Sequence, residues 1–216
     1  MHPAGTPLPT KGCTMTATAP AGLLALAEEA QDLLFREART ANTFTSEPVT
    51  DEQLRAVYEL VKWAPTAMNA QPLRIVAVRG AAAKERLVPL MAEGNRAKTA
   101  AAPVSLIVAA DEDFHEHMPV IWHNPDARDN LAASPGRAGM ARFNATIQLG
   151  YLILGIRAAG LAAGPMAGFD AEAVEKEFLA AGNLRAIAVV NAGRPGPDAW
   201  FRRNRRLEFE QVVTVL

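Results

Sequence analysis

The chain has 216 residues, 50% of them hydrophobic, with a formal net charge of −1 and an isoelectric point near 6.4. This composition suffices for the core of one globular domain, and the near-neutral balance excludes an overall basic field of the kind that holds nucleic acid or an anionic membrane. The single cysteine, Cys13, excludes an intrachain disulfide and any cysteine-only metal cluster, and it indicates a reducing compartment, the cytoplasm.

Residues 1–20 are rich in Pro, Thr, Ala and Gly and lack the charged start and apolar middle of a secretory signal. We expect a disordered amino-terminal tail, followed by a single domain over residues 21–216. Met15 is an alternative start for the chain. No uncharged apolar run reaches the length of a membrane span, so we expect a soluble protein.

The first predicted helix covers residues 22–38, where apolar residues recur at helical spacing opposite acidic ones. It leads into Arg39, Thr40 and Asn42. Arginine and hydroxyl groups beside a helix end suit a phosphate group. The alternative is a solvated last turn in which arginine complements the helix dipole.

A second helix begins at a capping box formed by Thr50 and Gln53 and stops before Pro65, which lacks a backbone N–H. Its apolar residues follow the helical period up to the proline. The pattern predicts an amphipathic helix that ends abruptly at a polar connection.

That connection, residues 64–72, carries the hydroxyl of Thr66 and the amides of Asn69 and Gln71. Together these groups can donate to and accept from the edge of a flat heteroaromatic ring. A polar turn between two prolines is the alternative interpretation.

Residues 74–79 show a buried-strand pattern, residues 81–92 a helical one, and residues 104–110 a second apolar strand. Asn95 and Lys98 precede this second strand. The polar pair is therefore placed, like the first polar connection, next to a strand.

Periodicity disappears over residues 111–137, and we expect a structureless flap over a site, because such long segments are usually functional or mobile. Within it, His115, His117 and His123 suit zinc or iron as ligand types. Their spacing matches no established metal motif, so solvated loop histidines are favoured and no metal site is expected.

Residues 139–161 form the longest helical candidate, and its second half is apolar on every face. We expect it to be buried in a subunit interface as well as in a core, which favours a homodimer. A helix buried within a single chain is the alternative.

Residues 164–170 read as a rigid turn, with Asp170 placed to cap the helix that follows. Residues 184–191 form a third strand pattern. Residues 201–207 contain four arginines and suit a phosphate clamp or a solvated basic face, while the neutral net charge argues against a nucleic-acid contact.

The sequence lacks the glycine-rich Rossmann fingerprint, the phosphate loop of nucleotide hydrolases and the G-x-S-x-G nucleophile elbow. No side chain is an obvious nucleophile. If the chain is an enzyme, its chemistry belongs to a bound cofactor.

Together these features resemble the FMN-dependent nitroreductase family, from about residue 33 to the carboxyl terminus. The family's Arg-Ser-x-Arg-x-Phe phosphate motif is similar to residues 39–44, with Asn42 in place of the second basic residue. Its Ala-Pro-Ser-x-x-Asn-x-Gln-Pro motif is similar to residues 64–72, and its Pro-x-x-Gly-Phe-Asp turn to residues 165–170. The resemblance implies an α+β, three-layer fold with a central mixed, mainly antiparallel sheet flanked by helices. It also implies a homodimer built around a long buried helix, with FMN sites at the subunit interface.

The family's Asn-x-x-Lys motif, near the pyrimidine side of the flavin, resembles Asn95 and Lys98. The resemblance implies that Lys98 stabilises negative charge at flavin N1/O2, and that the backbone N–H of Ala167 or Gly168 meets flavin N5. NADPH or NADH is the implied transient hydride donor. The implied FMN-binding residues are Arg39, Thr40, Asn42, Pro65, Thr66, Ala67, Asn69, Gln71, Asn95, Lys98, Pro165, Met166, Ala167, Gly168, Arg203, Arg205 and Arg206.

Within the family, residues 38–42 and 164–170 look like those of the malonic semialdehyde reductases of bacterial uracil degradation. This similarity implies reduction of malonic semialdehyde to 3-hydroxypropionate by hydride transfer through flavin N5. The substrate carboxylate requires a cation, for which Arg128, Arg137 and Arg142 are candidates. The alternatives are a broad-specificity nitroreductase, quinone or flavin reductase and, in another class, a non-enzymatic FMN-binding protein.

Overall fold

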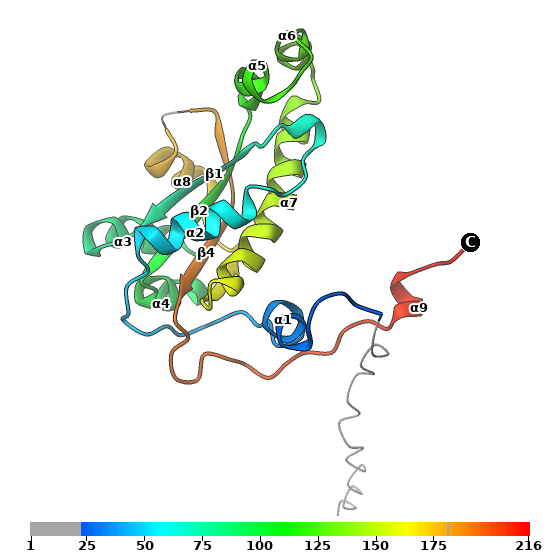
Figure 1. Ribbon diagram of the computed structural model, residues 1–216. Coiled ribbons are helices and arrows are strands. Elements are labelled where there is room, and N and C mark those ends of the chain that lie inside the picture. The colour runs from blue at the N-terminus through cyan, green and yellow to red at the C-terminus, as the bar shows by residue number, and fades with distance from the viewer. Residues whose placement is uncertain (1–22, 181) are drawn as a thin grey trace, which may run out of the picture.

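A computed structural model describes residues 23–180 and 182–216, so the expected tail and Cys13 lie outside the described residues. Four strands form one sheet in the order β1-β2-β4-β3, and all three pairings are antiparallel. The strands are β1 (Leu73–Val78), β2 (Val104–Asp111), β3 (Ala162–Met166) and β4 (Leu184–Gly193). Helices flank the sheet (Figure 1), which confirms the expected α+β fold class.

The helical elements vary widely in length, and α7 is the longest of those described. None of the described helices combines the length and apolarity needed to cross a membrane. In chain order they are α1 (Glu28–Gln31), η1 (Asp32–Arg36), α2 (Asp51–Val61), η2 (Ala67–Asn69), α3 (Ala81–Leu87), η3 (Val88–Leu90), α4 (Glu93–Ala101), η4 (Phe114–His117), α5 (Met118–Ile121), α6 (Ala127–Ala132), α7 (Arg137–Ala158), α8 (Ala171–Phe178) and α9 (Phe209–Val212).

Two hydrophobic cores lie on opposite faces of the sheet. On one face, α2 and α7 pack with Leu106 and Val108 of β2. On the other face, α3 and α8 pack with Ile107 and Ala109 of the same strand. Because successive side chains of a strand point to opposite faces, every residue of β2 is buried. Strand β2 thus lies at the centre of a three-layer arrangement, with helices on both faces of the sheet.

Two helix starts follow their sequence signals. The Thr50 side chain accepts a hydrogen bond from the Gln53 N–H, and the Gln53 side chain accepts one from the Thr50 N–H, which confirms the capping box. The Asp170 carboxylate accepts a hydrogen bond from the Ala173 N–H at 3.0 Å and begins α8. Each cap satisfies an N–H that has no partner inside its helix.

Helix α7 spans the core and packs closely on α2. A Cβ atom on Gly155 would clash with Val61 of α2, so glycine permits this approach. The two helices contribute jointly to one core. The opposite side of α7 is open to solvent in the single chain, where Phe143 is 67% exposed and Tyr151 is 42% exposed.

Residues 111–137 are not structureless, contrary to the expectation. They contain η4, α5 and α6, and Phe114, Met118 and Leu131 form part of a third hydrophobic cluster. Each helix here has only one or two turns, too short to produce a recognisable helical period. The segment lies beside one end of α7 (Figure 1).

Three other elements differ from the sequence expectation. Strand β1 lies at the sheet edge, which leaves Ile75 37% exposed instead of buried. Residues 164–166 belong to strand β3 although they were expected to begin a turn, because the Ala, Gly and Pro residues of this strand are depleted in strands and give no strand signal. The first helix begins at Glu28 and continues as η1, so it is shorter than expected.

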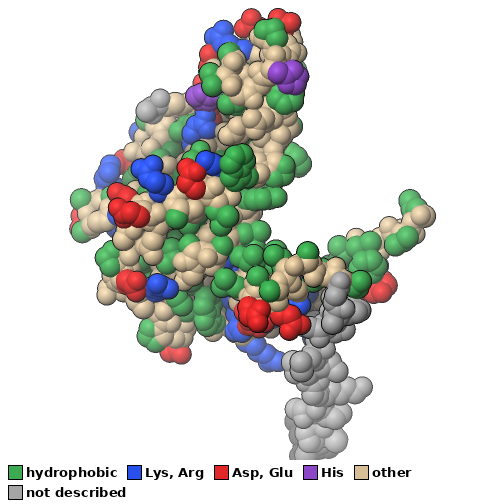
Figure 2. All heavy atoms as spheres, viewed as in Figure 1, with side chains coloured by type: hydrophobic (Ala, Val, Ile, Leu, Met, Phe, Trp, Pro, Cys, Tyr) green, Lys and Arg blue, Asp and Glu red, His purple; other side chains and the backbone are tan. Residues whose placement is uncertain are grey.

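After β4 the chain returns beside its amino-terminal segment and then leaves the body. The Asn42 N–H donates to the carbonyl oxygen of Ala199 at 3.0 Å, and the Thr45 N–H donates to that of Arg194 at 3.0 Å. Residues 200–216 form an extended arm that carries α9, and all of its residues are exposed. Figure 1 shows the arm running away from the sheet, and Figure 2 shows hydrophobic side chains along it.

Candidate functional site

The connection between α2 and β1 contains strained backbone. Met68, Asn69 and Gln71 have positive φ angles of 54°, 54° and 44°, a region that residues other than glycine rarely adopt. The Thr66 hydroxyl oxygen accepts a hydrogen bond from the Gln71 N–H at 3.2 Å, and the Asn69 amide donates to the Ile121 carbonyl oxygen at 3.0 Å. Strain that the surrounding structure holds in this way is typical of functional sites.

Two amides of α7 support this connection, and the sequence analysis did not identify them. The Asn144 side-chain oxygen accepts from the Ala67 N–H at 2.7 Å, and the Gln148 side-chain oxygen accepts from the Leu73 N–H at 3.0 Å. Both side chains belong to buried residues. Their polarity inside a largely apolar helix was the available signal, since buried amides need partners.

The structure also changes which groups of the connection are available to a ligand. The Thr66 oxygen and the Asn69 amide each make a hydrogen bond within the chain, and the Gln71 side chain donates to the Asn69 carbonyl oxygen at 3.3 Å. Pro65 and Ala67 are exposed. Asn69 is exposed as well, so its side-chain oxygen is a polar group of the connection that remains open to a ligand.

Helix α4 and the turn after β3 are joined directly. The Asn95 amide donates to the Gly168 carbonyl oxygen at 2.9 Å, and the Ala92 N–H donates to the same oxygen at 3.0 Å. A Cβ atom on Gly168 would lie 2.8 Å from the Asn95 side-chain nitrogen, so glycine is required at this distance. The N–H groups of Ala167 and Gly168 donate to no acceptor in residues 23–180 and 182–216.

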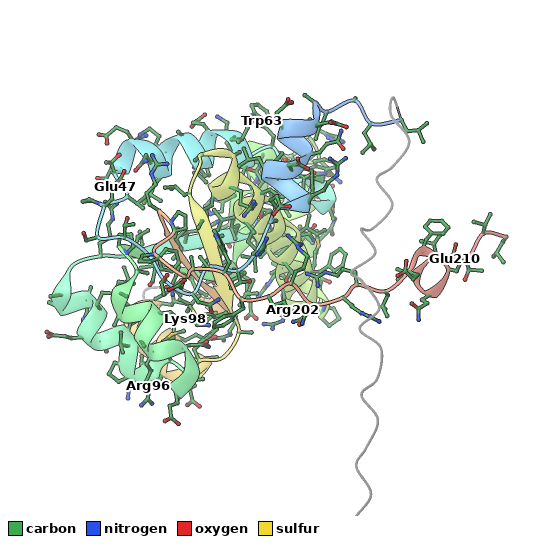
Figure 3. The ribbon with its side chains drawn as sticks, turned by 90° about the horizontal axis from the view of Figure 1, so that it is seen from below. Glu47, Trp63, Arg96, Lys98, Arg202 and Glu210 are labelled. Atoms are coloured by element: carbon green, nitrogen blue, oxygen red, sulfur yellow. The ribbon has the colours of Figure 1, made fainter. Side chains whose placement is uncertain are left out.

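Lys98 belongs to α4, three residues after Asn95, and is half-buried. Over the described stretches of the chain, no carboxylate lies within 4.0 Å of its ammonium group. Figure 3 shows Lys98 and Arg96 on α4 and Arg202 on the arm. Helix α4 thus carries a cation without a carboxylate partner in the described residues, three residues beyond the asparagine that binds the turn.

The segment with Arg39, Thr40 and Asn42 is held against β3. Its Ala41 N–H donates to a β3 carbonyl oxygen at 3.1 Å. A Cβ atom on Gly164 would lie 2.9 Å from the Ala41 carbonyl oxygen, so glycine permits the close approach. This contact places the expected phosphate segment beside the strand that leads into the turn at Ala167 and Gly168.

Within residues 23–180 and 182–216, the carboxyl-terminal arginines make no hydrogen bond or ion pair with that segment. Arg203 donates to the carbonyl oxygen of Arg36, and Arg206 donates to the carbonyl oxygens of Asn204 and Arg205, at 3.1 and 3.3 Å. All three expected phosphate ligands on the arm are exposed.

Of the three arginines considered for a substrate carboxylate, two have partners. Arg128 contacts both carboxylate oxygens of Glu116, at 2.8 and 3.1 Å, and this bond holds the pKa of Glu116 below its usual value. Arg137 donates to the Ala132 carbonyl oxygen at 2.9 Å and lies 3.8 Å from the Asp113 carboxylate.

Arg142 differs from both, because no carboxylate within the described part of the chain lies within 4.0 Å of it. It borders an open hollow of about 510 Å³ on α7. The other residues that line this hollow are Gly139, Phe143, Thr146 and Ile147.

The flap histidines do not gather into a metal site. His117 lies 4.0 Å from the Asp111 carboxylate, and His115 is buried 3.4 Å from that of Glu116. Among the residues that the structure describes, no three His, Cys, Asp or Glu side chains are grouped so that they could hold a metal ion.

Comparison with known proteins gives consistent results. The sequence model described as "Nitroreductase family" matches residues 35–194. A Streptomyces coelicolor protein named "Putative NADH dehydrogenase/NAD(P)H nitroreductase" is 59% identical over 89% of this chain and 99% of its own length. A protein of the same name from Leptothrix cholodnii is 50% identical over 85% of this chain and 94% of its own length.

Solved structures show the same fold. A Bacillus subtilis protein titled "putative nitroreductase" is 25% identical, with a TM-score of 0.75 over 85% of this chain and 97% of its own. An Exiguobacterium sibiricum protein, solved in complex with FMN, is 16% identical, with a TM-score of 0.75 over 94% of this chain and its full length.

Proposed function

This chain belongs to the nitroreductase family, and on that premise we propose that it is an FMN-dependent NAD(P)H oxidoreductase that reduces malonic semialdehyde. The observation that carries the proposal is the bond between Asn95 and Gly168, which holds the helix of Lys98 against the turn with two free N–H groups.

The residues around this turn fit a flavin. Gly168 has no room for a side chain on the side that faces Asn95 and Ala92, so the turn lies close against α4. The free N–H groups of Ala167 and Gly168 suit an acceptor nitrogen, and Lys98 suits an electron-rich edge. These three groups complement the two sides of a ring that becomes negatively charged on reduction.

When bound, FMN supplies the hydride-transfer chemistry, and the chain supplies orientation and electrostatics. Lys98 stabilises negative charge at flavin N1/O2, where a fixed cation away from water acts more strongly than in solution. The Ala167 or Gly168 N–H orients flavin N5. The remaining proposed FMN contacts are Arg39, Thr40, Asn42, Pro65, Thr66, Ala67, Asn69, Gln71, Asn95, Pro165, Met166, Arg203, Arg205 and Arg206.

We propose further that the active unit is a homodimer with FMN sites at the subunit interface. The extended arm of residues 200–216 carries Phe201, Leu207 and Phe209, which no other described residue buries. Exposed apolar surface of this extent marks an interaction site. Arg206 points to the same conclusion, because within the described residues its guanidinium donates only to the neighbouring carbonyl oxygens of Asn204 and Arg205. A second copy could place this arginine near its neighbour's phosphate segment.

Arg142 is the proposed anchor for the substrate carboxylate. Arg128 and Arg137 are committed to acidic partners, whereas Arg142 has none among the described residues and borders a hollow. Guanidinium binds carboxylate in two parallel hydrogen bonds, so this arginine also fixes the orientation of a small acid.

A broad-specificity nitroreductase is the second candidate, because the name of the 59% identical relative includes "NAD(P)H nitroreductase". The two functions are separated by steady-state kinetics of the FMN-loaded protein with malonic semialdehyde and with nitrofurazone. A kcat/KM at least about tenfold higher for malonic semialdehyde supports the first function. The reverse preference supports the second.

A further inference from the structure

A buried polar network lies beneath α4, and the site described above uses none of its four side chains. Lys84, Thr99, Ser105 and Asn191 are all buried. The Lys84 ammonium donates to the Thr99 carbonyl oxygen at 2.7 Å and to the Ser105 hydroxyl oxygen at 2.6 Å. Ser105 donates to the Asn191 side-chain oxygen at 2.5 Å. No acidic group faces the ammonium within 4.0 Å in the described part of the chain.

Lys84 caps α4 from a neighbouring helix. The last four carbonyl oxygens of a helix have no partner inside it, and Thr99 is one of the last four residues of α4, which ends at Ala101. A cation at this end also interacts favourably with the helix dipole. The ammonium therefore fixes the carboxyl-terminal turn of α4 relative to α3 and β2.

The same network reaches the turn after β3. The Asn191 amide donates to the Thr99 hydroxyl oxygen at 3.4 Å, and both groups lie 3.9 Å from the Met166 sulfur. Met166 immediately precedes Ala167. In the ladder between β3 and β4, Asn191 pairs with Gly164. One end of α4 is thus joined to β3 through this network, and the other end is joined to Gly168 through Asn95.

We propose that Lys84 is a positioning residue, which caps α4 and thereby holds Lys98 at a fixed place relative to the turn at Ala167 and Gly168. The proposal rests on the proposed flavin function. Lys84 acts on the flavin only through the position of Lys98, and it contacts neither the flavin nor the substrate.

If the Lys84 side chain only filled space in the core, it would not need to be a cation. Burial lowers the pKa of Lys84 to about 8, because the charged form loses its hydration. An apolar side chain of similar length avoids that cost. The cation instead supplies two directed hydrogen bonds, one of them to the backbone next to Lys98.

The test compares Lys84→Met, Lys98→Ala and the double variant in the full-length, FMN-loaded protein. The readouts are the midpoint potential of the bound flavin and its dissociation constant. We expect Lys84→Met to shift the potential to more negative values, as Lys98→Ala does, and to weaken FMN binding about tenfold. In the double variant, Lys84→Met adds no further shift. Lys176→Met, an exposed lysine on α8, is the control and changes neither value.

Two outcomes would overturn the proposal. An unchanged midpoint potential in Lys84→Met would show that Lys84 has a structural role only. Additive shifts in the double variant would mean that its charge acts on the flavin directly. If Lys84→Met does not fold, Lys84→Gln removes the charge while keeping a polar side chain beside the Thr99 carbonyl oxygen and the Ser105 hydroxyl, and gives the same comparison.

A flavin-independent readout separates this proposal from the proposed function. The Ala102 N–H donates to the backbone carbonyl oxygen of Lys98 at 3.2 Å. Its rate of hydrogen exchange therefore measures how stably the carboxyl-terminal turn of α4 is formed in FMN-free protein. We expect exchange at least about tenfold faster in Lys84→Met than in Lys176→Met. Equal exchange contradicts the cap, whereas wild-type protein that binds no FMN contradicts only the proposed function.

Discussion

The side-chain amide of Asn95 donates a hydrogen bond to the carbonyl oxygen of Gly168 across 2.9 Å, and this bond joins α4 to the turn after β3. The two residues are far apart in the sequence, and each belongs to a different polar motif. Their contact joins the helix that carries Lys98 to the turn that carries the N–H groups of Ala167 and Gly168. The proposed chemistry depends on this arrangement more than on any single side chain.

Gly168→Ala tests the close packing at this contact. The added Cβ would lie 2.8 Å from the Asn95 nitrogen and 3.2 Å from the Ala92 Cβ, so α4 or the turn must move. We expect FMN affinity to fall about tenfold or more, equivalent to about 1.4 kcal/mol. Fluorescence titration measures it. Gly94→Ala is the matched control on α4, because a Cβ there meets nothing within 4 Å. Equal affinities of the two variants would contradict the geometry.

Arg142→Met tests the carboxylate anchor. Loss of a guanidinium–carboxylate pair raises the KM for malonic semialdehyde about tenfold or more, while kcat/KM for the uncharged nitrofurazone stays within about twofold. Steady-state kinetics with both substrates measure the difference. Arg55→Met, an exposed arginine on α2, changes neither. Parallel losses for both substrates would show that Arg142 does not discriminate by charge.

Removal of residues 200–216 tests the role of the arm. We expect the full chain to sediment as a dimer, and the truncated chain to dissociate at micromolar concentration because its exposed apolar side chains no longer find a partner. FMN affinity falls with it, since Arg205 and Arg206 are removed. Deletion of residues 1–20 is the control and leaves association unchanged. A truncated chain that remains a dimer with full FMN affinity would refute this role.

The burial of the Lys84 ammonium predicts an unusual dependence of the folded chain's stability on pH. Its pKa is about 8 in the folded chain against 10.5 ordinarily, so between these values the unfolded chain holds a proton that the folded chain has released. The free energy of unfolding of the wild type therefore rises over this window, relative to Lys84→Met, by up to about 3 kcal/mol. Urea unfolding of both proteins at pH 7.5 and pH 10 measures it. A constant difference would show that burial does not penalise the cation.

The resemblance to a known family predicted the fold class, whereas sequence patterns predicted two helix starts because the signals for these are local. The capping box at Thr50 and the cap at Asp170 each depend on residues three positions apart. The buried pattern of β2 likewise lies within eight residues. Such features need no knowledge of distant contacts.

Other features depend on contacts between distant residues, and no local pattern contains them. Asn144 supports a connection 77 positions away, and Gly164 makes room for the backbone of Ala41. The positive φ of Met68 is imposed by its surroundings, because methionine has no preference for that region. In the sequence, Lys84 looks like any other helical lysine, and only the structure shows its contacts with Thr99 and Ser105.

Anaerobic titration of the flavin-free protein with FMN, followed by NADPH or NADH, tests whether this chain is an FMN-dependent oxidoreductase. We predict that one FMN binds per chain and that its visible absorption is lost when the nicotinamide is added, as expected for hydride transfer to the flavin. A protein that stays colourless after FMN addition and gel filtration would contradict the account. So would bound FMN that neither nicotinamide reduces, because the protein would then bind the cofactor without using it.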